Sequence, residues 1–187
     1  VYEWSFDTKL GNDFELLSNG KSIGMFKRTD PVISFGGYGG VVKIFDENGT
    51  ESWSYDYTNG NDIAHHDVEM LPSGNVIFLV WEEISAFEAQ DAGVNFTSNV
   101  YTEKLIEVNP NTNQVEWEWR SWDHIVQEHD PNALNYDSVV NNPQRIDINY
   151  NIEPNGDFMH ANGLSYDATK DVVYISVNYF SEVWAID

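Results

Sequence analysis

The sequence predicts an all-β domain assembled from repeated four-stranded units. Short runs rich in Val, Ile, Tyr, Phe and Trp alternate with polar turn segments along the chain of 187 residues. No long window keeps the 3.6-residue period of a helix; the ambiguous segment is EISAFEAQDAG at 83–93, which suits a short helix or a long loop. We therefore expect less than about a tenth of the chain to be helical.

Five turn clusters mark the ends of the expected strands. Their Gly, Asn and Asp residues tolerate a positive φ or bond their own backbone, and apolar runs lie on both sides. The clusters read SNGK at 18–21, DENGT at 46–50, PSGN at 72–75, NPNTNQ at 109–114 and DATKD at 167–171. The glycine-rich FGGYGG at 35–40 lacks the lysine and hydroxyl of a phosphate-binding loop, so it predicts a tight strand entry.

Two segments follow one scheme, which is the main evidence for a repeat. Residues 41–57 and 104–120 each contain an apolar strand, a polar turn and a strand with aromatic residues at alternate positions. A third copy begins with EVWAID at 182–187. A second hairpin precedes each copy: ELLSNGKSIGMF at 15–26, VEMLPSGNVIFLVW at 68–81 and LSYDATKDVVYISV at 164–177.

Two hairpins per unit make four strands, which is the blade of a β-propeller. The alternate aromatic residues are then expected to pack between neighbouring blades and not to form a binding platform. The chain holds parts of about three or four blades, whereas closed propellers have about four to eight. We expect residues 1–187 to form a single β-propeller domain and favour a fragment of a longer chain; the alternative is that another chain completes the ring. An aromatic blade face should then lie exposed or under that other chain.

Charge and composition exclude several classes of partner. The formal net charge is −22, from 31 acidic and nine basic residues, so we expect no nucleic-acid partner and no binding to an anionic membrane surface. No apolar run approaches the length that spans a bilayer, so no membrane insertion is expected. The absence of cysteine excludes disulfides and thiolate metal sites.

Histidines precede two of the expected innermost strands. HHD at 65–67 and FMHANGLSYD at 158–167 occupy similar places in successive units, which should bring His66 and His160 together at the axial channel. Such histidines could hold a tetrahedral anion, bind a metal, or act as nucleophile and acid; the structural alternative is that they satisfy backbone groups. An anion site of this kind should bind sulfate more tightly at lower pH, because an imidazolium adds charge and donors.

Four segments together resemble the bacterial arylsulfotransferase family. They are HHDVEMLPSGN, VEWEWRSWDH, RIDINY and the run DFMHANGLSYDATKDVVYISVNYFSEVWAID, so the likeness covers roughly residues 36–187. The resemblance implies a six-bladed propeller in the periplasm or outside the cell, without a cofactor. It also implies transfer of a sulfuryl group from an aryl sulfate to a phenol through a sulfated histidine.

The resemblance further implies roles for particular residues. His66 and His160, with His65, would bind the sulfuryl oxygens and assist the leaving phenol, and Asn162 of the same motif would contact the substrate. Asn178 stands where the family commonly has an arginine. The nucleophilic histidine would belong to a later blade, beyond Asp187, so this chain alone is expected to be inactive.

Two further polar residues are candidates for substrate contact. RSWDHIVQEHDP at 120–131 contains His124 and His129, but their spacing is not a common metal-ligand pattern, so a solvated insert without a metal is expected. The SWDH motif recurs in the family that this sequence resembles, which would place His124 at the channel rim. Arg145, in the long loop 130–151, could supply a cation.

Two alternatives remain open at this level. The first is an exported β-propeller scaffold that binds a ligand or a partner protein without catalysis, which the asparagine at position 178 favours. The second is a quinone-dependent dehydrogenase propeller, which shares the repeated tryptophans. That class needs calcium ligands and a tryptophan that stacks on the cofactor, and the sequence does not identify them.

Overall fold

The computed structural model describes residues 3–57 and 59–187, which form three antiparallel sheets and one short parallel pair. The first sheet contains β1 (Leu10–Leu16), β2 (Ser22–Lys27), β3 (Gly40–Phe45) and β4 (Glu51–Asp56). The second contains β5 (Ile63–Met70), β6 (Val76–Ile84), β7 (Val100–Asn109) and β8 (Gln114–Arg120). The third contains β11 (Ala161–Asp167), β12 (Val172–Val177) and β13 (Glu182–Ile186).

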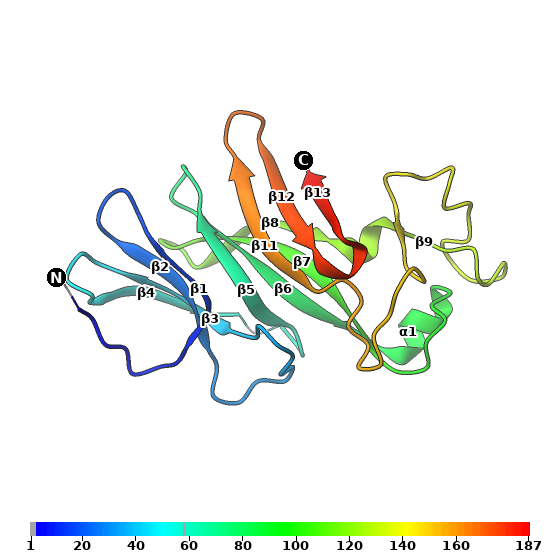
Figure 1. Cartoon of the computed structure of the whole chain (residues 1–187), viewed down its shortest axis with the longest axis horizontal. Helices are drawn as coiled ribbons and strands as arrows, with labels where there is room; N and C mark the ends of the chain where they lie inside the picture. The colour runs from blue at the N-terminus through cyan, green and yellow to red at the C-terminus, as the bar shows by residue number, and fades with distance from the viewer. Residues whose placement is uncertain (1–2, 58) are drawn as a thin grey trace.

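The three sheets have the strand order and arrangement of propeller blades. In each sheet the strands are hydrogen-bonded in sequence order. Figure 1 shows the sheets standing next to one another, with β5 in contact with both β1 and β11. These first strands therefore form the inner row. The all-β, propeller-like class is confirmed, with parts of three blades, and the described residues do not close into a ring.

Helical structure is minor, as the sequence predicted. Strands make up 46% of the chain and helices 7%. The ambiguous segment at 83–93 contains the short helix α1 (Ala86–Asp91), which begins where the Ser85 hydroxyl accepts a hydrogen bond from the backbone N–H of Glu88. The part of the chain that the structure describes has no helix of the length and apolar character needed to cross a membrane.

The hairpin turns share one backbone feature, which explains their composition. In the turn between β5 and β6, the N–H of Leu71 donates to the Asn75 carbonyl at 2.8 Å, and Gly74 has a φ of 87°. A positive φ at this place favours Gly, Asn or Asp. The corresponding residues of the other turns are Gly20, Gly49, Asn113 and Asp171.

The core lies between neighbouring sheets. Every residue of β6 except Glu83 is buried, and its side chains alternate between the two sheet interfaces. Phe78 and Val80 pack toward the first sheet, in a cluster with Met25 of β2. Ile77 and Leu79 pack toward the third sheet. Burial of both faces is what a central propeller blade requires, and it explains the nearly continuous apolar run.

The aromatic residues on alternate positions of the outer strands follow the predicted packing role. Trp53 and Tyr55 of β4 stack with ring centroids 5.8 Å apart and border the core between the first two sheets. Trp117 and Trp119 of β8 border the core between the second and third sheets. On the far side of the third sheet, Val183 is 69% exposed.

The inner strands use carboxylates to satisfy their free edges. The backbone N–H of Leu164 on β11 donates to Asp67 of β5 at 2.7 Å, and that of Tyr166 donates to Glu69 at 2.9 Å. Unpaired backbone groups at a buried sheet edge are costly, so these contacts join β5 to β11 where no strand ladder exists.

Beyond β8 the chain leaves the repeat. It forms the 3₁₀ helix η1 (Ser121–His124) and then the parallel pair of β9 (Ile125–Val126) and β10 (Ile146–Asp147). The connection between these two strands is the long loop that the sequence predicted, and it lies beside α1 through a bond from the Leu134 N–H to the Asp91 carbonyl. A second 3₁₀ helix, η2 (Asn178–Phe180), joins β12 to β13.

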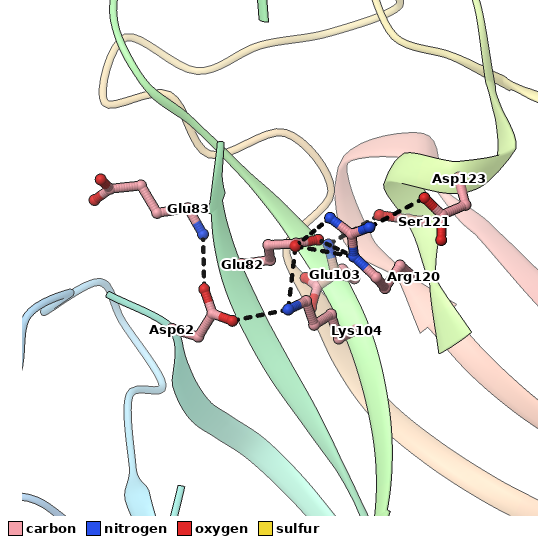
Figure 2. Close-up of polar contacts among 8 residues, drawn as sticks. All are labelled: Asp62, Glu82, Glu83, Glu103, Lys104, Arg120, Ser121 and Asp123. Carbon is pink, nitrogen blue, oxygen red and sulfur yellow. Dashed lines mark hydrogen bonds and ion pairs between the residues drawn. The ribbon is translucent and has the colours of Figure 1, made fainter. Parts of the chain in front are cut away.

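Charged side chains form a buried network at one end of the second sheet (Figure 2). The Lys104 ammonium lies 2.9 Å from Asp62 and 3.1 Å from Glu82, and all three side chains are less than a tenth exposed. Arg120 contacts the same Glu82 and extends the network to Asp123 at 3.1 Å. The network links β6, β7 and β8 to Asp62, the residue before β5, on the sheet face opposite to Glu103.

Removing one partner of this network should destabilise the fold. Lys104→Met leaves Asp62 without its cation in a buried place, so the free energy of unfolding should fall by about 3 kcal/mol, measured by urea denaturation. The matched control is Lys43→Met, whose partner Glu51 is 42% exposed; its cost should be at most about 1 kcal/mol. Equal losses in the two variants would show that the network at Lys104 has no special weight.

A second prediction concerns the half-buried Asp13 of β1. Burial, followed by the charges of Asp67 and Glu15, raises the pKa of Asp13 from 3.8 to about 7. The folded state therefore holds a proton that the unfolded chain releases, and the free energy of unfolding falls as the pH rises through this interval. Asp13→Asn should raise the midpoint of thermal unfolding clearly at pH 8 and hardly at pH 4.

The exposed Asp30→Asn is the control for the Asp13 variant, because it makes the same chemical change at a position open to solvent. It should shift the midpoint little at either pH. A gain for Asp13→Asn that is the same at both pH values would contradict the raised pKa.

Candidate functional site

Three histidines from two sheets meet beside the inner strands. His65 and His66 lie on β5, and His160 immediately precedes β11. The ring centroids of His66 and His160 are 5.0 Å apart, with their planes at 76°. The convergence predicted from the repeat is therefore confirmed, although His66 lies within β5 and not ahead of it.

The strand pairing is irregular next to these histidines. The β5–β6 register passes from His65, opposite Leu79, to Val68, opposite Phe78, so His66 and Asp67 bulge from the ladder. The pairing of β11 is interrupted in the same way between Ala161 and Gly163. His66 and His160 both have a left-handed backbone, with φ of 50° and 49°. Residues other than glycine seldom adopt this conformation, and it is more frequent at functional sites.

The His65 ring is fully buried and is fixed by stacking and by contacts at both ring nitrogens. Its ring is 0% exposed and stacks on Trp81 with centroids 3.8 Å apart. Its Nε2 lies 2.7 Å from Glu103 Oε2, and its Nδ1 lies 2.9 Å from Nδ1 of His66. Burial lowers the pKa of His65 well below its usual value, so this ring is neutral at physiological pH.

Glu103 connects the histidines to the third sheet. Its side chain is 1% exposed, and Oε1 accepts a hydrogen bond from the backbone N–H of Ala161 at 2.7 Å. Burial raises the pKa of Glu103 well above its usual range. A carboxyl that is normally ionised at neutral pH therefore has a strong tendency to hold a proton here.

His66 is also neutral, and the segment before β3 approaches its ring closely. Burial, and then electrostatic repulsion between the protonated forms of His66 and the adjacent rings of His65 and His160, lower the pKa of His66 to about 3. Its backbone N–H donates to the carbonyl of Gly37 at 3.0 Å. Gly37 has a φ of 91°, and a Cβ there would lie 2.0 Å from His66 Cε1, so no other residue fits beside the ring.

His160 has the opposite electrostatic character. Its Nδ1 bonds to Asp157, whose carboxylate is buried, and this bond raises the pKa of His160. The Tyr179 ring stacks on the other side with centroids 5.2 Å apart. The second oxygen of Asp157 has no hydrogen-bond partner among the residues that the structure describes. A neutral imidazole and a ring that favours the cation thus lie side by side.

This geometry agrees with a comparison of the chain with known families. The family model described as Arylsulfotransferase (ASST) matches residues 2–187. The chain belongs to the arylsulfotransferase family. No match was found among curated proteins. The family supports sulfotransferase activity of the aryl sulfate type in general, with aryl sulfates and phenols as substrates.

Two asparagines predicted from the arylsulfotransferase motifs lie near the histidines in different ways. The side-chain nitrogen of Asn162 is 3.2 Å from Nε2 of His66, so Asn162 belongs to the cluster. Asn178 begins η2 and is exposed, and its backbone N–H donates to the His160 carbonyl at 3.3 Å. The structure thus brings together His65, His66, His160 and Asn162, with Asn178 at the edge.

His124 and Arg145 lie elsewhere. Both border a cavity of about 670 Å³ between β8, the 130–151 loop and β13, whose lining does not include the histidine cluster. His124 is exposed and its ring stacks on Trp119 with centroids 5.4 Å apart. Arg145 donates to the Ile125 carbonyl at 3.2 Å. The two residues share a site with each other and not with His66 and His160.

Four residues that contact or approach the histidine cluster were not identified from the sequence: Gly37, Trp81, Glu103 and Asp157. Glu103 is an acidic residue inside an otherwise buried strand, which is a detectable signal of a functional or paired charge. Asp157 precedes His160 by three residues, within the same motif. Gly37 belongs to the FGGYGG segment, which was interpreted only as a strand entry.

The contact between Gly37 and His66 gives a direct test of the site. Gly37→Ala must adopt a strained φ and displace the His66 ring, so the free energy of unfolding should fall by about 1–3 kcal/mol in urea denaturation. Gly36→Ala is the matched control, because a Cβ at Gly36 meets no atom within 4 Å. Indistinguishable stabilities of the two variants would contradict the close approach.

Proposed function

We propose that this chain supplies the sulfuryl-binding histidines of an enzyme that transfers the group from a phenolic sulfate ester to a phenolic acceptor. The main support is the pairing of a neutral His66 with a His160 that favours the cation, with ring centroids 5.0 Å apart. A sulfuryl group in transfer carries negative charge on its oxygens, and fixed donors near those oxygens lower the barrier.

The two rings would have different roles. With Nδ1 bonded to Asp157, a protonated His160 has its Nε2–H left to donate to a sulfuryl oxygen. His66 is neutral, so its Nε2 exchanges a proton with the phenol oxygen without carrying a lasting charge. Asn162, which contacts that nitrogen, would help to orient the substrate.

The chemical route follows the family resemblance. The first phenol leaves as the sulfuryl group passes to a nucleophilic histidine, and a second phenol then takes the group from that histidine. His65 and His66 share a hydrogen bond, and His160 is paired with an acid, so we assign none of them as nucleophile. The 187-residue chain is then inactive alone, and the full-length protein carries the activity.

A specific observation favours binding without transfer as a second candidate. Asn178, where the family commonly has an arginine, is exposed at the start of η2 and next to the His160 backbone. A site without that cation would retain an anion or an aryl sulfate but stabilise the transferred charge less. In that case Asn178→Arg should strengthen sulfate binding.

The assay uses the full-length protein with 4-nitrophenyl sulfate and a phenol acceptor. We expect acceptor-dependent release of 4-nitrophenolate, measured by absorbance. His160→Ala should lower kcat/KM by about 100-fold, because a donor to the sulfuryl oxygens is lost. The control is His129→Ala, whose exposed side chain lies outside the cluster; it should leave the rate unchanged.

The pH dependence follows from the raised pKa of His160. Protonated His160 binds the anion, so sulfate affinity should fall as the pH rises through that pKa, and His160→Ala should abolish the dependence. Calorimetric titration at two pH values measures both effects. Binding without turnover would favour the second candidate, and neither binding nor turnover would exclude both.

A further inference from the structure

A continuous line of hydrogen bonds leads from the proposed substrate position into the protein. Asn162 contacts Nε2 of His66 at 3.2 Å, and Nδ1 of His66 lies 2.9 Å from Nδ1 of His65. Nε2 of His65 then lies 2.7 Å from Glu103. Each imidazole therefore uses both ring nitrogens in the line of hydrogen bonds. The inner end of this line is the Glu103 carboxyl, which solvent does not reach.

We propose that Glu103 and His65 form a proton relay that stores, between the two half-reactions, the proton exchanged at Nε2 of His66. This inference rests on the proposed sulfuryl transfer and adds two residues that do not touch the substrate. His65 and Glu103 are positioning residues that act through His66.

Each contact of the line needs one proton, which gives the relay two end states. In the loaded state the Glu103 carboxyl donates to His65 Nε2, Nδ1–H of His65 donates to His66, and Nε2–H of His66 faces the substrate. In the empty state every bond is reversed, the Glu103 carboxylate accepts, and Nε2 of His66 has a free electron pair. The Asn162 amide has both a donor nitrogen and an acceptor oxygen, so it suits either state.

The proton balance closes over one catalytic cycle. In the first half-reaction the bond from sulfur to the donor oxygen breaks with its electron pair on oxygen, and Nε2–H of His66 protonates that phenolate. The His65 and Glu103 protons then shift toward His66, which leaves Glu103 ionised. In the second half-reaction the acceptor phenol gives its proton to His66, and its oxygen attacks the sulfur of the sulfated histidine. The S–N pair returns to that histidine, and the relay is loaded again.

Burial explains why a relay suits this place. An imidazolium at His65 would have to be stable while fully buried and stacked on Trp81, which is costly. Both end states of the relay leave both rings neutral and place the change of charge on Glu103. The titratable groups that act on the line from neighbouring elements are Asp157 and His160, whose opposite charges largely balance.

Glu103→Gln in the full-length protein tests the relay. Glutamine keeps the shape and the bond to the Ala161 N–H, but it cannot store a proton. In the parent enzyme His66 protonates the leaving 4-nitrophenolate, but this phenolate can also leave without a proton. Rapid mixing should therefore show a burst of about one equivalent in the variant as in the parent. Steady-state turnover with an acceptor that is un-ionised at the assay pH should fall by about 100-fold or more.

A second measurement separates a relay from a structural role. Acceptors that are already ionised, such as 4-cyanophenol at mildly alkaline pH, need no base, so they should restore turnover of Glu103→Gln to within a few-fold of the parent. The control is Glu107→Gln on the same strand, whose side chain bonds Asn75 and no histidine; it should behave as the parent with every acceptor.

The outcomes are distinct. Unchanged turnover of Glu103→Gln with un-ionised acceptors would overturn the relay. An equal loss with all acceptors, without recovery by ionised ones, would also overturn it and assign Glu103 a structural role. Absence of both burst and turnover in the parent enzyme would instead reject the proposed sulfuryl transfer itself.

Discussion

The structure depends on the burial of both faces of its second sheet. Side chains on successive residues of a strand point to opposite faces, so β6 and β7 must satisfy two different neighbours at once. Over most of their length apolar residues meet this requirement. At one end the neighbouring residues Glu103 and Lys104 direct an acidic and a basic side chain to opposite faces, and each of these buried groups needs partners of its own. The histidine cluster and the ion-pair network are therefore two sides of the same short piece of strand.

The local surroundings give three chemically identical side chains different pKa values. His65 and His66 lose solvent without gaining a firm negative partner, and their pKa values fall. His160 gains the Asp157 carboxylate, and its pKa rises. Proximity alone would make these rings repel one another when protonated; unequal burial and one carboxylate allow them to lie in contact with a single positive charge among them. That division of charge suits the proposed sulfuryl transfer, in which one group attracts an anion and another exchanges a proton.

The elements that could be predicted from the sequence are those that repeat. Hairpin turns, alternating aromatics and the convergence of His66 with His160 all follow from equivalent positions in successive units. The partners of those histidines could not be predicted, because Glu103 reaches His65 from a strand 38 residues away and Ala161 from 58 residues away. Periodicity also does not determine the path of a long loop, so it did not indicate that Arg145 lies apart from the cluster. The bulge that places His66 inside β5 is a local departure from the strand pattern and leaves no periodic signal.

The contact between Gly37 and His66 has a consequence for how the protein reaches its working form. Gly37 comes from the segment before the first sheet's third strand, His66 from the second sheet and Asn162 from the third. Repeat units of this kind acquire their secondary structure largely by nearest-neighbour interactions, so a partly assembled chain has intact hairpins. The cluster of His65, His66, His160 and Asn162 does not exist in such an intermediate until the units have packed together, since no single unit contains it. The proposed activity would then be the last property gained during folding and the first lost on gentle heating, ahead of any change in strand content.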